Sequence, residues 1–133
     1  MRITADTNLL VRSIVADDAG QARAAQKLLA EAELVAIPVT VWCELVWVLG
    51  RSYNQPRQQI AEAIRRLLAA ATVTTDKPAA EAGLAAMEQG GDFADGVAAY
   101  LGRSLGGQEF VSFDRKAVRV LNGLGISASI PNA

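Results

Sequence analysis

Apolar side chains recur at intervals of three and four residues in several stretches of the chain, which is the period of an amphipathic helix. One stretch has apolar residues at Ala22, Ala25, Leu28, Leu29 and Ala32. A second is apolar over nearly its whole length from Val41, and a third begins at Pro56, a residue suited to the first turn of a helix. The pattern predicts helices over residues 21–32, 41–49, 56–68, 79–87, 92–105 and 114–121.

Short β-leaning runs separate these helices, and turn-forming residues mark their boundaries. Pro38 ends the second run, Thr40 is suited to cap the helix that follows, and Gly50 is suited to stop it. We therefore expect strands over residues 2–5, 34–37, 72–74, 109–112 and 125–130. Alternation of short strands with helices is typical of a parallel sheet covered on both faces, so the predicted fold is three-layer α/β/α with a central parallel sheet.

Length and composition limit the organisation of the chain. Its 133 residues suit one compact domain, and 51% are apolar, so we expect a single domain over residues 1–133. The net charge of −1 gives no sign of a nucleic-acid binder, although it can hide a local basic patch. The opening residues do not resemble a secretory signal, and the most apolar stretch, 36–50, is too short to span a membrane. The single cysteine, Cys43, excludes an internal disulfide, so the predicted location is the cytoplasm.

The chain contains no histidine. This excludes the usual general base of serine and cysteine hydrolases, the paired histidines of metal-free ribonucleases, and the commonest zinc ligand. Any catalysis must therefore rest on carboxylates, lysine, hydroxyls or a bound hard metal ion.

Four acids, called here the acidic quartet, stand near predicted strand ends. Asp6 directly follows the first strand and Asp114 the fourth, while Glu44 and Asp95 lie about one turn into predicted helices. Right-handed crossovers bring the carboxyl ends of parallel strands to one edge, so these acids should converge there. At ~4 Å and an effective dielectric constant of ~20, each pair would repel by roughly 4 kcal/mol. The quartet therefore predicts a site for Mg²⁺, or alternatively Mn²⁺, which prefers oxygen ligands.

Each acid also has a purely structural interpretation. Asp92 and Asp114 are suitable N-caps, Asp95 fits the first turn after Asp92, and Asp6 fits an ordinary turn. Capping is the favoured interpretation for Asp92 alone. Glu44 lies among residues that are apolar on both helix faces, where an unpaired buried charge costs several kcal/mol, so a functional role is favoured there.

Four segments resemble the motifs of PIN domains, particularly the VapC-type toxins of bacterial toxin–antitoxin pairs. They are ADTNLL around Asp6, VWCEL around Glu44, DFADG (followed by VAA) around Asp95, and VSFDRK around Asp114. The resemblance covers nearly the whole chain, in the family's order. It implies a PIN-like, Rossmann-like fold and a Mg²⁺-dependent endoribonuclease, with Asp6 and Asp95 as its core metal ligands.

The motifs depart from the family pattern at two positions. Ser112 stands where threonine is commoner, and Gly96 replaces the usual alanine, which should weaken its helix only slightly. Ser112, together with Thr7 and Asn8, could orient the metal ligands or a phosphate oxygen. A structural role in turns explains each of the three equally well.

Catalysis would use the metal to activate a water and to neutralise charge on the scissile phosphate. Glu44 and Asp114 would bind the metal directly or through waters. RNA also needs cations nearby, and Arg12, Arg115 and Lys116 are the nearest in sequence, although a solvated helix face is the favoured explanation for each. Trp42 and Trp47 could stack on bases, but packing in the core or against a subunit is favoured.

The resemblance also implies two partners, a cognate VapB-type antitoxin whose C-terminal segment lies in the active-site groove, and a second copy in a homodimer. Three other functions stay open. An aspartyl-nucleophile phosphatase would need a second aspartate where Asn8 stands. A receiver-like signalling domain would need an acid pair after the first strand, an aspartate after the third and a lysine after the fifth, and the acid pair and the lysine are not in place. The third is a non-catalytic metal-binding or interaction module on the same fold.

Overall fold

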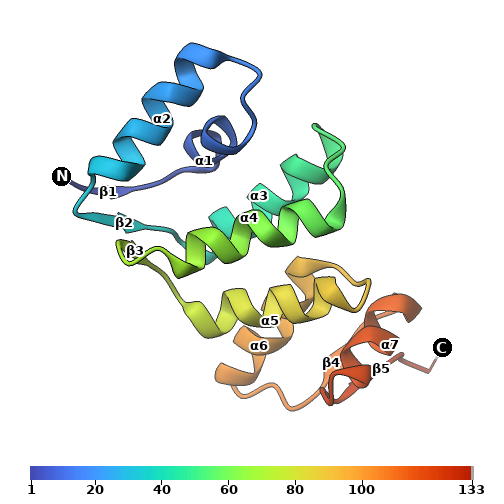
Figure 1. Cartoon of the computed structure of the whole chain (residues 1–133). Helices are drawn as coiled ribbons and strands as arrows, with labels where there is room; N and C mark the ends of the chain where they lie inside the picture. Colours follow the sequence, from blue (N-terminus) through green and yellow to red (C-terminus); the bar gives the residue numbers. More distant parts are fainter. Residues whose placement is uncertain (133) are drawn as a thin grey trace. The chain divides into compact units, whose positions relative to one another are not determined.

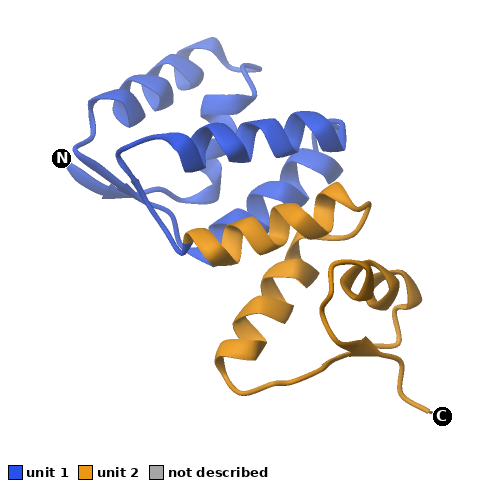
Figure 2. Cartoon of the chain, turned by 60° about the horizontal axis from the view of Figure 1, so that its bottom comes forward, with its two compact units in different colours: residues 1–76 blue, residues 77–133 orange. Residues whose placement is uncertain are grey.

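The computed structural model describes residues 1–132, which form seven helices and five strands. The chain divides into two compact units, Met1–Asp76 and Lys77–Ala133, drawn in blue and orange in Figure 2. Every strand pair within the units is parallel. The predicted α/β class with parallel strands is therefore confirmed.

The first unit is built on a three-stranded parallel sheet in the order β1-β2-β3 (Figure 1). Its strands are β1 (Arg2–Thr4), β2 (Leu34–Ala36) and β3 (Val73–Thr74). The helices that connect them are α1 (Thr7–Ile14), α2 (Ala19–Glu31), α3 (Val39–Arg51) and α4 (Arg57–Ala69). Thr4 pairs with Ala36, which pairs with Thr74, so the three strands end at one edge. Asp6 and the start of α3 follow directly from that edge.

Trp42 anchors α3 in the core of the first unit. Its side chain is fully buried, and its indole N–H donates a hydrogen bond of 2.8 Å to the hydroxyl of Thr75. That hydroxyl in turn donates to the backbone carbonyl of Ile37 at 2.6 Å. The relay satisfies the indole N–H and ties α3 to the chain segments that follow β2 and β3, so core packing is confirmed for Trp42.

The second unit contains a closely packed helix pair and a two-stranded sheet. Its elements in chain order are α5 (Lys77–Glu88), α6 (Phe93–Ser104), β4 (Phe110–Val111), α7 (Arg115–Gly123) and β5 (Ala128–Ser129). Gly96 lies where α6 approaches α5: a Cβ atom there would stand 2.8 Å from the Cβ of Ala86 and closer still to the carbonyl oxygen of Ala82. Glycine at this position is therefore a packing requirement, which corrects the expectation that its only effect is a slightly weaker helix.

The boundaries of α3 differ from those predicted. The helix begins at Val39 after Pro38, makes no side-chain capping bond, and continues through Gly50 to Arg51. Thr40 as cap and Gly50 as stop are thus both wrong. Pro38 already directs the chain into the helix with its restricted φ of −65°. Gly50 does not adopt a positive φ, and a glycine inside a helix costs only about 1 kcal/mol.

Candidate functional site

Three of the acids singled out from the sequence cap helices. Each accepts a backbone hydrogen bond through its Oδ1 atom: Asp6 from Leu9 at 2.8 Å, Asp92 from Ala94 at 3.2 Å, and Asp114 from Ala117 at 3.1 Å. The capping interpretation is confirmed for Asp92 and Asp114. Asp6, which was expected in an ordinary turn, caps α1 in the same way. Each of these capping bonds uses one carboxylate oxygen, so capping leaves a second oxygen as a donor for a cation.

The fold disturbs the ionisation of Asp95. It lies half-buried in the first turn of α6, behind the cap Asp92. Burial raises the pKa of the Asp95 carboxyl, and the negative charges of Asp92 and Asp114 raise it further. The second unit therefore places Asp92 and Asp114 within electrostatic reach of Asp95.

Replacing Asp95 with asparagine should stabilise the metal-free protein at neutral pH. Because the pKa of folded Asp95 lies above its unfolded value, the fold loses stability as pH rises from the ordinary pKa of aspartate to the raised folded pKa, and the full loss persists at higher pH. Below the ordinary pKa of aspartate the group is neutral in both states, and the advantage of asparagine should vanish. Solvent screens this partly exposed group, so we expect no more than about 1 kcal/mol in urea melts.

The matched control for this measurement is Asp18→Asn. Asp18 is an exposed N-cap of α2, its Oδ1 accepts from Gln21 at 3.0 Å, and asparagine caps a helix equally well. The Asp18→Asn variant should have nearly the same free energy of unfolding as the unmodified protein at neutral pH. A destabilised Asp95→Asn variant at neutral pH would contradict the repulsion described above.

Glu44 lies on the exposed face of α3, which corrects the expectation that it is enclosed by apolar neighbours. The buried face of the helix is narrow and consists of Trp42, Leu45 and Leu49. The burial argument for a functional Glu44 is therefore wrong. Its position about one turn into the helix that follows β2 agrees with the sequence.

The neighbouring polar residues have mainly structural contacts. The hydroxyl of Ser112 accepts a hydrogen bond of 3.0 Å from the N–H of Asp114, and Thr7 is buried at the start of α1 while Asn8 is exposed. Arg12 pairs with Asp17 at 3.1 Å, and its Nε atom is buried without a hydrogen-bond partner. Arg12 thus does not belong to a simple solvated face.

The acidic quartet is divided between the two units: Asp6 and Glu44 belong to the first, and Asp95 and Asp114 to the second. Of these four, the structure links Asp95 and Asp114 through the electrostatic effect described above. Among residues 1–132, no group of three or more histidine, cysteine, aspartate or glutamate side chains lies close enough together to hold a metal ion. The chemistry of the acids nevertheless suits Mg²⁺, because every one offers hard oxygen donors.

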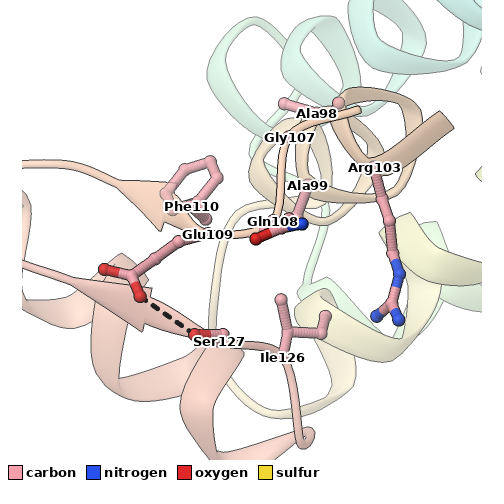
Figure 3. A pocket seen from close by; sticks show the side chains of 10 residues that line it. Ala98, Ala99, Arg103, Gly107, Gln108, Glu109, Phe110, Ile126 and Ser127 are labelled. Atoms are coloured by element: carbon pink, nitrogen blue, oxygen red, sulfur yellow. Dashed lines mark hydrogen bonds between the residues drawn. The ribbon is translucent and has the colours of Figure 1, made fainter. Parts of the chain in front are cut away.

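A small pocket of about 80 Å³ lies in the second unit, beside the C-terminal half of α6 (Figure 3). Arg103 and the apolar side chains of Phe110 and Ile126 line it together with Glu109. Glu109 accepts hydrogen bonds from the hydroxyls of Ser127, at 3.1 Å, and Ser129, and these bonds lower the pKa of its carboxyl. The sequence alone did not predict this pocket, because its charged residues have the same sequence pattern as charged residues on a solvated surface.

None of the helices formed by residues 1–132 combines the length and the apolar character needed to cross a membrane.

Comparison with curated proteins and with solved structures gives no significant match. The family model described as PIN domain matches residues 3–121, a span that contains all four acidic motifs. Parallel strands joined by helices agree with the predicted three-layer α/β/α fold of this family. PIN domains are generally nucleases that act on RNA and usually use divalent metal ions. With most of its length matched, this chain belongs to the PIN domain family.

Proposed function

We propose that this protein is a Mg²⁺-dependent endoribonuclease of the VapC type, the toxin of a toxin–antitoxin pair, acting in the cytoplasm as one domain over residues 1–133. The observation that carries the proposal is the environment of Asp95. Its carboxylate is half-buried and repelled by Asp92 and Asp114, and within the described residues it has no ion pair that offsets this repulsion. A divalent cation would turn this unfavourable arrangement into a binding site.

Asp6 and Asp95 would hold the ion directly, and Glu44 and Asp114 directly or through waters, with Mn²⁺ as an alternative to Mg²⁺. The ion, when bound, supplies a water of lowered pKa and neutralises charge on the scissile phosphate. The capping bonds of Asp6 and Asp114 restrict the rotation of both carboxylates and so fix the direction of their remaining oxygens. Ser112 fixes the turn before α7, which makes it a positioning residue for Asp114.

Basic side chains beside this site would contact the RNA backbone. Arg115 and Lys116 are exposed and directly follow Asp114, so they are the best placed for phosphates. Arg12 is the weaker candidate, since Asp17 already engages its guanidinium. We further propose a VapB-type antitoxin and a homodimer as partners. A short neighbouring reading frame for a DNA-binding protein would support the antitoxin assignment.

The test is cleavage of a structured RNA by the purified full chain, with Mg²⁺, with EDTA, and with excess Mg²⁺ added after EDTA. We expect cuts with Mg²⁺, none with EDTA, and recovery when Mg²⁺ is restored. Cleavage that persists in EDTA would contradict the metal mechanism. Hydrolysis of a phosphate monoester would favour the phosphatase alternative, and stable phosphorylation by a small phosphodonor the receiver-like alternative. The absence of any activity would favour the non-catalytic module.

A further inference from the structure

Helix α3 presents a continuous exposed stripe opposite its buried face. Trp42 is fully buried, whereas Trp47 is 61% exposed. Thr40, Glu44 and Arg51 are exposed as well, and with Trp47 they follow the four- and three-residue spacing that places side chains on one face of a helix. A lone tryptophan therefore stands in an otherwise polar stripe.

Arg51 accompanies the exposed indole. Its Cζ atom lies 5.9 Å from the centroid of the Trp47 ring, within the range of a cation–π contact. The two residues are one helical turn apart, so the helix itself holds the guanidinium beside the ring. This arrangement combines a flat aromatic surface with a positive charge that is close to it.

We propose that Trp47 and Arg51 form a contact site for single-stranded RNA, in which an unpaired base stacks on the indole and Arg51 contacts the adjoining phosphate. The inference rests on the proposed ribonuclease function, because Glu44 of the quartet lies on the same stripe, roughly 4.5 Å before Trp47 along the helix axis. A strand bound at Trp47 would thus extend toward Glu44.

Charge distribution favours RNA over a protein partner at this stripe. Tryptophan and arginine are also enriched at protein interfaces, but the centre of such an interface is mainly apolar, and the exposed neighbours of Trp47 on this stripe, Thr40, Glu44 and Arg51, are all polar. Aromatic side chains beside cations are the usual means of holding single strands, because every base has a face that can stack. Base-paired RNA keeps its bases stacked inside the helix and should not use this site.

The experiment measures binding of a fluorescently labelled single-stranded RNA to the full chain in EDTA, so that no cleavage is needed. Trp47→Leu should weaken binding by roughly five- to a hundredfold with little change in salt dependence, and Trp47→Phe should retain most of the affinity. Arg51→Gln should make the negative slope of log K against log salt shallower by about 0.7, because one phosphate contact on a single strand is lost. A duplex of the same length should bind all variants alike.

Leu105→Ala is the matched control, since Leu105 is also large, apolar and exposed, at 88%, but lies in the second unit. It should bind RNA like the unmodified protein. Quenching of tryptophan fluorescence on RNA addition should be present in the unmodified chain and lost in Trp47→Phe, where only Trp42 remains. Thermal melts confirm that each variant is folded.

Two results would overturn the proposal: no binding of single strands, or equal RNA binding by Trp47→Leu. If equal RNA binding is accompanied by a change from dimer to monomer, Trp47 belongs to a protein interface. A separate measurement tests the proposed function: if it is wrong, the unmodified protein shows no Mg²⁺-dependent cleavage, whatever its RNA affinity.

Discussion

Replacing Asp6 with asparagine is expected to abolish RNA cleavage while leaving the thermal melt nearly unchanged. The asparagine carbonyl can still accept the N–H of Leu9, and asparagine is as good an N-cap as aspartate. Asp6 is exposed, so the exchange disturbs no packing. The negative charge that would hold Mg²⁺ is lost, however, and a metal contribution of several kcal/mol corresponds to a loss on the order of a thousandfold or more.

The matched control for Asp6→Asn is the same substitution at a second capping aspartate, Asp18. Asp18 is exposed and caps α2 through the same kind of bond, so Asp18→Asn imposes the same chemical change away from the proposed ligands. It should cleave RNA at the rate of the unmodified protein. If Asp6→Asn also cleaves at that rate, Asp6 is a cap only, and the proposed metal site must be abandoned.

Helix starts were the features best predicted from the sequence, because their causes are local. Asp92 and Asp114 cap α6 and α7 where the sequence placed them, and α4 begins directly after Pro56. The physical reason is the same in each case: the residue at the boundary satisfies a free backbone N–H or restricts φ by itself. Thr40 failed as a cap because Pro38, two residues earlier, already occupies the N-cap position and the helix begins at Val39.

Burial along α3 could not be predicted, because it depends on how much of the helix its neighbours cover. The run from Val41 to Leu49 is almost entirely apolar, and it suggested a helix enclosed on all sides. Only a narrow face is buried, while Glu44 and Trp47 on the opposite side are exposed. Sequence order likewise placed the quartet near strand ends, but the distances between its members are set by tertiary packing.

The packing role of Gly96, in the DFADG motif, could not be predicted from the sequence either. Its intrinsic helix propensity suggested a small effect, since propensity describes an isolated helix. Gly96 and Gly83 both lie on the contact between α5 and α6, and a Cβ at Gly83 would stand 2.7 Å from the ring of Phe93. Such close approach depends on a partner helix ten or more residues away, so no local pattern reveals it.

Gly96→Ala is accordingly expected to destabilise the second unit, by about 3 kcal/mol. The added methyl would meet the backbone carbonyl of Ala82, which cannot move without shifting α5, as well as the side chain of Ala86. Urea melts give the free energy of unfolding. The control Gly102→Ala lies on the same helix with no atom within 4 Å of the added Cβ, so it should gain up to about 1 kcal/mol in helix propensity.

The same substitution connects packing with the proposed chemistry, because Gly96 directly follows Asp95 in the first turn of α6. Any shift of α6 away from α5 moves the Asp95 carboxylate, together with its cap Asp92, relative to Asp114. Gly96→Ala should therefore also weaken Mg²⁺-dependent cleavage at temperatures where the variant is still folded. Gly102→Ala should leave cleavage unchanged. Equal stability of the two variants would mean that α5 and α6 do not approach as closely as described, and that the glycine in this motif has no packing role.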